Sequence, residues 1–331
     1  MDVRSEEPSL PAGRGGISDA LVECLREGGP PPDRREVAGA DPFGEDLQLA
    51  LYLCYELHYR GFAGVADDRE WDPGLLRFRA SLERPFLEAL RAVATRHERA
   101  DEALDELLVE PVNPADGGVS RFLADEGELW QLREYAAQRS LYHLKEADPH
   151  AWVLPRLWGR AKAGMAAVEF DEFGGGRADR VHARLFADLM TDLGLDPSYG
   201  RYVDVARAET LALVNLMSLF GLHRSLRGAL VGHFAAVEIT SSPASRRLAK
   251  AMRRTGAGAA AEHFYTEHVE ADAVHEQVVR HEVVAGLLTE EPRLDADVAF
   301  GVDATNHLED VLADRFLDDW RAGRSSLRVP A

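Results

Sequence analysis

Apolar residues recur at spacings of three and four along most of the chain, from about residue 43 to residue 323. This spacing places apolar side chains on one face of a helix, and no run alternates with a period of two for long enough to predict a strand. The pattern therefore predicts an all-α protein, with helical segments near 43–60, 73–104, 119–147, 151–173, 177–194, 202–221, 224–241, 244–254, 257–288 and 294–323.

Proline and glycine mark the expected ends of these segments. The stop signals lie at Asp72-Pro73, Pro111 to Gly118, Asp148-Pro149, Gly174 to Gly176, Asp196-Pro197, Ser241 to Pro243, Gly256 and Glu291-Pro292. Residues 1–42 are rich in Pro, Gly and charge around one short helical phrase, ISDALVECLRE. We interpret residues 1–42 as a mobile N-terminal tail and linker, and residues 43–331 as a single helical domain.

Composition narrows the classes of function. The chain has 331 residues and a formal net charge of −19, which argues against nucleic acid or an anionic membrane as a partner. Two cysteines, Cys24 and Cys54, are too few for a disulfide scaffold or a thiolate-rich metal site. The first residues lack the features of a secretory signal, and no apolar run is long enough to span a membrane. We expect a soluble, cytoplasmic protein.

The phrase HVEADAVHE (268–276) is the most informative in the chain. His268, Asp272 and His275 stand at i, i+4 and i+7, within a narrow arc of one helical face. Two imidazoles and a carboxylate on one stripe are typical ligands of a redox-active transition metal. A solvated polar face explains the phrase equally well by itself, so the choice depends on carboxylates elsewhere.

Several acidic residues elsewhere could complete such a site. Glu172 ends a predicted helix, three glycines follow, and His182 comes next. An unbroken helix would hold Glu172 and His182 about 15 Å apart. Consecutive glycines favour a break, which could be an ordinary turn between helices and could also bring the two residues back towards a common centre. Glu146 lies just before a proline-initiated helix, and Glu238 lies late in an apolar helix, where an unpaired carboxylate is costly to bury. Glu238 could instead reach solvent at a helix end.

The order of these residues resembles the haem-oxygenase-like diiron oxidases and oxygenases, also called iron-containing redox enzymes. The phrases KEADPHAW, DEFGGGR and FYTEHVEADAVHE carry the resemblance over most of residues 140–290, and YELHYRGF (55–62) supports it more weakly. Carried over residue by residue, the resemblance implies that seven residues bind iron and form the catalytic site: Glu146, Glu172, His182, Glu238, His268, Asp272 and His275.

The resemblance also implies a fold and a type of chemistry. The fold would be a haem-oxygenase-like helical bundle, here with extra N-terminal helices. Two Fe(II) ions would be the cofactor and dioxygen the co-substrate. The second substrate would be a small metabolite such as an amino acid, an amine or a fatty acid, and the reaction N-oxygenation or the cleavage of C–C or C–H bonds. An external electron donor and a homodimer are expectations at the level of the family.

Two other interpretations stay open from the sequence. A ferritin-like diiron bundle would use Glu146, Asp179-x-x-His182, Glu238 and Asp272-x-x-His275, which leaves Glu172 and His268 unused. A non-catalytic helical scaffold would only pair the same polar groups with one another. A zinc hydrolase is less favoured, because His275-Glu276 lacks the HExxH spacing.

Further residues could surround the site. Tyr265, Glu276, His143 and His150 could contact the ligands, and Arg160 and Arg177 could anchor a substrate carboxylate. Leu213, Leu216, Met217 and Phe220 could line a pocket, although we favour a role in the core. We interpret the remaining histidines as structural or exposed: His58, His223, His233, His263, His281 and His307.

Overall fold

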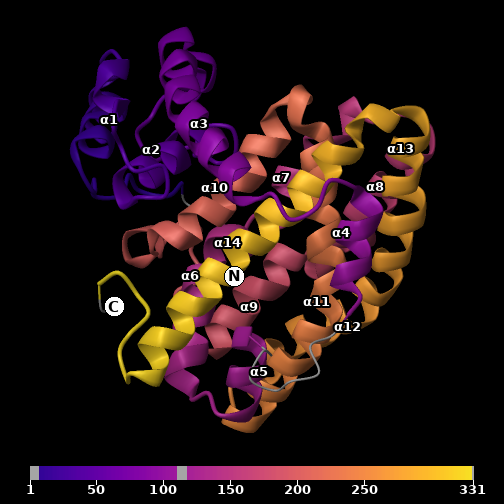
Figure 1. The fold of residues 1–331 in the computed structure, drawn as a ribbon. Helices are drawn as coiled ribbons and strands as arrows, with labels where there is room; N and C mark the ends of the chain where they lie inside the picture. Colours follow the sequence, from indigo (N-terminus) through magenta and orange to yellow (C-terminus); the bar gives the residue numbers. More distant parts are fainter. Residues whose placement is uncertain (1–6, 110–117, 330–331) are drawn as a thin grey trace.

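The computed structural model describes residues 7–109 and 118–329. Helices joined by short connections make up these two ranges, which contain no strand, so the predicted all-α fold is confirmed. Figure 1 shows the helices in order. They are α1 (Gly16–Glu27), α2 (Glu45–Glu56), α3 (Pro73–Val93), α4 (Ala100–Leu107), α5 (Gly118–Asp125), α6 (Leu129–His143), α7 (Asp148–Ala151), α8 (Gly159–Glu172), α9 (His182–Asp192), α10 (Ala208–Leu222), α11 (Arg227–Thr255), α12 (Ala259–Val278), α13 (Ala285–Glu290) and α14 (Asp295–Arg321).

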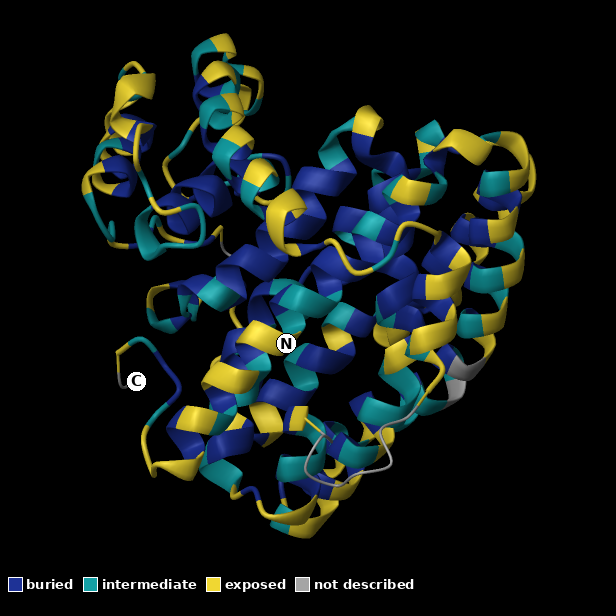
Figure 2. Ribbon diagram, in the orientation of Figure 1, coloured by how far each residue is buried: buried dark blue, intermediate teal, exposed yellow. Residues whose placement is uncertain are grey.

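Helix α11 is the centre of the bundle, where it packs against α12, α14, α5 and α10. It approaches α14 most closely at two glycines. A Cβ atom at Gly232 or at Gly301 would lie 2.0 Å from a carbonyl oxygen of the opposite helix. Only glycine allows the two backbones to come so near. Figure 2 shows the buried residues gathered on the inner faces of these helices.

Helices α1, α2 and α3 form a layer beside the C-terminal bundle (Figure 1). Ile17, Leu21 and Leu25 are buried where α1 packs against α2. Helix α2 also packs against α3 and α10, which joins the layer to the bundle. The phrase ISDALVECLRE is therefore a helix, as predicted, and it lies against the rest of the protein. The division of the chain at residue 42 stays a prediction.

One predicted stop is wrong, because α11 continues through Pro243. Proline removes a backbone hydrogen bond from the helix interior. Residues on both sides of it, among them Ile239 and Leu248, are nevertheless buried against neighbouring helices. Most helical stability in proteins comes from such packing rather than from local propensity, so the helix persists.

Other segments are shorter than predicted. The segment 73–104 is interrupted after α3, where Asp303 of α14 accepts hydrogen bonds of 2.8 Å from the backbone N–H groups of Arg96 and His97. The segment 119–147 divides into α5 and α6, and the long helix predicted over 151–173 begins only at Gly159, after α7 and one turn of 3-10 helix at Leu154–Arg156. Of the stop predicted at Pro111 to Gly118, only Gly118 is among the described residues, where it begins α5, and residues 1–6 also lie outside them.

None of the described helices is both long enough and apolar enough to cross a membrane.

Candidate metal centre

Glu146 lies in a tight turn between α6 and α7. The next residue, Ala147, has a φ of 74°, an angle that residues other than glycine adopt rarely and at a cost. The turn directs the Glu146 side chain into the interior, where Oε1 lies 2.9 Å from Nδ1 of His143. Glu146 is 7% exposed.

The three glycines after α8 break the helix between Glu172 and His182, as the sequence predicts. Gly174, Gly175 and Gly176 have φ angles of 72°, 61° and 81°, and at Gly174 a Cβ atom would lie 2.6 Å from the backbone carbon of Arg180. This reversal starts α9 beside the end of α8. As a result, Nδ1 of His182 lies 2.7 Å from Oε2 of Glu172, and both side chains are buried.

The remaining predicted ligands lie on two helices that pack against each other along their length, α11 and α12. Glu238 projects from α11, and His268, Asp272 and His275 project from one stripe of α12. All four side chains are buried. Nδ1 of His275 lies 3.3 Å from Oε2 of Glu238 and 3.4 Å from Oε1 of Glu172.

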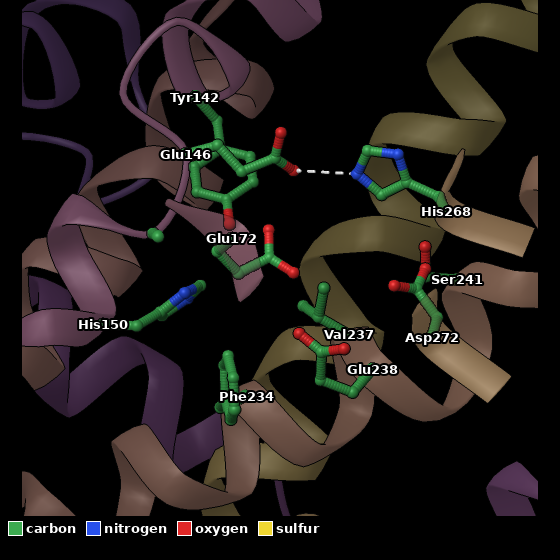
Figure 3. Close-up of a pocket in the computed structure, with 11 residues that line it drawn as sticks. Tyr142, Glu146, His150, Glu172, Phe234, Val237, Glu238, Ser241, His268 and Asp272 are labelled. Carbon is green, nitrogen blue, oxygen red and sulfur yellow. Dashed lines mark ion pairs between the residues drawn. The ribbon is translucent and has the colours of Figure 1, made fainter. Parts of the chain in front are cut away.

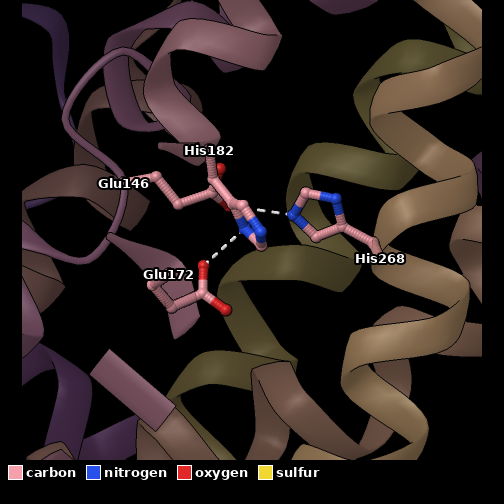
Figure 4. A group of neighbouring side chains, drawn as sticks. All are labelled: Glu146, Glu172, His182 and His268. Atoms are coloured by element: carbon pink, nitrogen blue, oxygen red, sulfur yellow. Dashed lines mark ion pairs between the residues drawn. The ribbon is translucent and has the colours of Figure 1, made fainter. Parts of the chain in front are cut away.

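The structure brings all seven predicted residues together in two adjacent groups. The first group is Glu146, Glu172, His182 and His268 (Figure 4), and the second is Glu172, Glu238, Asp272 and His275. Within each group, one potential ligand atom from every residue lies within 4.8 Å of the others. Glu172 belongs to both groups, so its carboxylate could bridge two ions.

Unpartnered atoms test whether these residues suit a metal. Buried polar atoms in proteins almost always have a hydrogen-bond partner. Nδ1 of His182 is close to Glu172, but the two do not meet the geometry of a hydrogen bond. Among the described residues, Glu146 Oε2, Glu238 Oε2, His268 Nε2, Asp272 Oδ2 and His275 Nδ1 likewise have no hydrogen-bond partner. These nitrogen and oxygen atoms are ligands that suit iron, so the residues present fit a metal pair.

Hydrogen bonds from outside the centre orient two of the imidazoles. Nδ1 of His268 donates to the carbonyl oxygen of Phe264 at 2.7 Å, which leaves Nε2 facing the first group. Nε2 of His275 lies 3.3 Å from Oδ2 of Asp171, which leaves Nδ1 facing the second group. Metal-binding histidines are commonly held in this way by a carbonyl or a carboxylate on the other ring nitrogen.

The pKa values show how strongly the metal-free centre holds protons. Burial disfavours charged His268, but Glu146 outweighs it and raises the pKa of that imidazole to about 10. Glu238 and Glu172 likewise overcome burial and raise the pKa of His275 to about 9. Burial and the nearby Asp272 raise the pKa of Glu238 to about 8. Protons thus occupy positions that metal ions would take.

A small cavity of about 20 Å³ lies between the two groups (Figure 3). Besides ligand candidates, its wall includes Tyr142, His150, Phe234 and Val237. This volume has room for about one water molecule. An organic substrate therefore requires neighbouring side chains to move.

Of the residues expected to contact the proposed ligands, some lie beside them and others do not. His143 contacts Glu146, and His150 lines the cavity while its Nε2 lies 3.1 Å from Nε2 of the buried His233. Tyr265 is buried, and its hydroxyl has no hydrogen-bond partner among the described residues. Glu276 instead lies 3.4 Å from Arg280.

Two predicted substrate anchors lie away from the cavity. Arg160 pairs with Glu282 and Arg177 pairs with Asp179, in both cases with more than half of the arginine side chain exposed. Neither arginine lines the cavity, because the turn at Arg177 and the start of α8 face outward. The apolar residues of α10, namely Leu213, Leu216, Met217 and Phe220, are buried in the core and not in the cavity wall.

One ligand of the ferritin-like alternative, Asp179, lies outside both groups. The Asp179 side chain is 71% exposed and lies 3.0 Å from Arg177, whereas Glu172 is buried between both groups. His58 also stays outside the centre, where its Nδ1 lies 3.0 Å from Glu70.

Sequence reasoning missed Glu169 and Asp171. Glu169 is 2% exposed, and neither of its carboxylate oxygens has a hydrogen-bond partner in the part of the chain that the structure describes. Burial and the charge of Glu172 raise its pKa to about 9, so it holds a proton at neutral pH. Its position one helical turn before Glu172 was the available signal, since residues three apart share a face. Asp171 had no comparable signal, because its contact with His275 depends on tertiary packing.

Comparison with known proteins agrees with this geometry. Residues 133–310, which include all seven residues, match the family described as iron-containing redox enzymes. A search of curated proteins finds no match to the chain. The resemblance drawn from the ligand order is thereby confirmed. Because the matched region covers more than half of the chain, this protein belongs to the haem-oxygenase-like iron-containing redox enzymes, a family of all-α oxidoreductases.

Proposed function

We propose that this protein binds two Fe(II) ions and uses dioxygen to oxidise a small metabolite. The proposed ligands are Glu146, Glu172, His182, Glu238, His268, Asp272 and His275. The observation that carries the proposal is the convergence of buried, unpartnered ligand atoms from these residues around the shared carboxylate of Glu172.

The charge of the ligand set supports two ions better than one. Its four carboxylates, Glu146, Glu172, Glu238 and Asp272, would offset the charge of two divalent cations. When bound, an iron pair supplies electrons and open coordination positions at which dioxygen can react.

The chain's own residues would control access and orientation. Phe234 and Val237 give the cavity an apolar wall that would limit the entry of water, and Tyr142 adds one hydroxyl near the carboxylates. Phe264 and Asp171 hold two imidazoles in the orientation that binding requires. The same ligand set serves N-oxygenation and C–C or C–H cleavage, so the reaction is proposed only as an oxygen-dependent oxidation.

Anaerobic reconstitution with Fe(II) tests the proposal. We expect uptake of close to two equivalents per chain and a transient visible absorption when the protein meets air. A correctly folded protein that takes up no iron above background would instead be the non-catalytic scaffold.

A substrate screen identifies the reaction once iron uptake is established. The reconstituted protein would be incubated with a reductant, oxygen and a panel of amino acids, amines and fatty acids, and the products followed by mass spectrometry. We expect at least one substrate to gain oxygen or lose carbon or hydrogen in an iron-dependent way. His268→Ala serves as the inactive control.

A further inference from the structure

A second polar cluster, built around a buried ion pair, lies on the other side of the turn that carries Glu146. We call it the outer cluster, and it consists of Glu56, Tyr59, Arg60, Lys145 and Tyr199. Three of these residues come from YELHYRGF, the N-terminal phrase to which the metal centre gives no role. That phrase lies outside the region 133–310 that matches the family.

Lys145 is held tightly within the outer cluster. Its Nζ lies 2.7 Å from Oε2 of Glu56, and the two side chains are 1% and 0% exposed. The hydroxyl of Tyr199 donates a hydrogen bond to the other oxygen of Glu56. Nζ of Lys145 also lies 4.1 Å from the centre of the Tyr59 ring, a distance suited to a cation–π contact.

Arg60 holds the residue before Lys145. Its Nη2 donates a hydrogen bond of 3.1 Å to the carbonyl oxygen of Leu144. Its guanidinium lies 4.2 Å from the centre of the Tyr199 ring. The outer cluster therefore fixes the turn at two successive residues, Leu144 and Lys145, directly before Glu146.

The turn needs such support because its backbone is strained. Ala147 has a φ of 74° and is 1% exposed, so it cannot relax into solvent. A residue held at an unfavourable backbone angle persists only when its surroundings determine that angle, and such residues occur often at functional sites. On the inner side, Glu146 has one oxygen beside His143 and one without a hydrogen-bond partner.

We infer that Glu56, Arg60 and Lys145 are positioning residues, which hold the strained turn so that Glu146 is oriented for metal binding before a metal arrives. The inference rests on the proposed function. Its physical basis is preorganisation: a ligand already in place loses less conformational freedom when the ion binds. The N-terminal layer thereby contributes to the metal centre without touching it.

Stepwise Fe(II) binding, measured anaerobically by calorimetry, tests the inference with two variants. Lys145→Met removes the buried cation. Arg60→Met removes the hydrogen bond to Leu144 at an exposed residue, so this variant is expected to fold. Glu146→Ala should abolish one of the two binding steps and thereby identify it. In Lys145→Met and in Arg60→Met, we expect the Fe(II) affinity of that step to fall by roughly 10- to 100-fold. The other step should change by less than about twofold, since partners outside the ligand set act on the ligand they hold.

Arg227→Met is the matched control. It breaks the ion pair between the buried Arg227 and Glu291. Neither residue is one of the seven proposed ligands. We expect it to lower thermal stability and to leave both binding steps unchanged.

The outcomes separate the inference from the proposed function. Wild-type protein that binds two irons, together with unchanged binding by Arg60→Met and Lys145→Met, overturns the inference and leaves the function intact. Equal weakening of both steps in all three variants also overturns it, because general destabilisation then explains the loss. Wild-type protein that binds no iron overturns the proposed function, and the inference with it.

Discussion

Two polar clusters lie on opposite sides of one turn, and they differ in how completely their atoms are paired. In the outer cluster, both oxygens of Glu56 have partners, supplied by Lys145 and Tyr199. In the metal centre, at least one nitrogen or oxygen atom of six of the seven residues has no hydrogen-bond partner among the described residues. Buried polar atoms in proteins are almost always paired, so a group of unpaired ones needs an explanation, and a bound metal is the one that these atom types suit. Burial and charge alone would not have separated the two.

The largest effect is expected at Glu172, the carboxylate that both groups share. We expect Glu172→Ala to weaken binding of both irons by more than about 100-fold, beyond the loss typical of residues that only support a ligand. Oxygen-dependent turnover should be lost with the iron. Iron content and product formation are the measurements.

Asp179→Ala is the control for Glu172→Ala. The Asp179 side chain is 71% exposed, so we expect normal iron content and turnover. Loss of iron in Asp179→Ala, with full iron content in Glu172→Ala, would favour the ferritin-like ligand set instead.

Changes in the outer cluster, unlike Glu172→Ala, should have a large effect on the stability of the metal-free protein. Lys145→Met leaves the buried Glu56 without its cation, and we expect a loss of about 3–5 kcal/mol in the free energy of unfolding. The double variant, Lys145→Met with Glu56→Leu, should recover most of the lost free energy of unfolding, because an apolar pair often replaces a buried ion pair at little cost. Urea unfolding of the metal-free proteins measures both. A double variant as unstable as the single one would contradict the view of a self-contained pair.

The metal centre should make the stability of the metal-free protein depend on pH. The pKa values of His268 and His275, about 10 and about 9, lie above the ordinary value for histidine, so the folded protein holds protons that the unfolded chain releases. Stability from these protons is complete below about pH 6.5 and is lost as pH rises through the folded values. Between pH 7 and pH 9, we expect the free energy of unfolding to fall by roughly 1.4 kcal/mol per pH unit for each of the two imidazoles.

Thermal melts of metal-free and iron-loaded protein at pH 7 and pH 9 check this expectation. Iron displaces the same protons, so the gain in melting temperature on iron binding should increase with pH. A gain that decreases as pH rises would mean that the imidazoles do not exchange protons for metal.

The smallest effect is expected at Ala147, between the two clusters. Ala147→Gly relieves the backbone strain at φ 74° but gives the unfolded chain more freedom. These terms oppose each other, so we expect the free energy of unfolding to change by less than about 1 kcal/mol. Iron affinity should fall slightly, because the turn is less restricted. Chemical unfolding and iron titration measure the two effects, and a large stability loss would show that the alanine methyl group has a packing role.

Much of the fold followed from local pattern. The helical spacing predicted the α fold, and the triple glycine predicted the reversal between Glu172 and His182. Boundaries failed where distant contacts decide them, as at Pro243, which packing keeps helical, and after α3, where Asp303 binds the chain. The partners of Arg160 and Arg177 were not predictable for a related reason, because a sequence does not show which nearby acid an arginine will meet.

The sequence by itself determined the types of the proposed ligands and the stripe on α12, because residues at i, i+4 and i+7 of one helix must share a face. Only the tertiary structure decided that Glu146, Glu172, His182 and Glu238 meet that stripe, since they lie on separate segments whose packing is set by the whole core. It also decided the supporting contacts of Asp171, Phe264 and the outer cluster. Such contacts join residues far apart in the chain, and no local pattern encodes them.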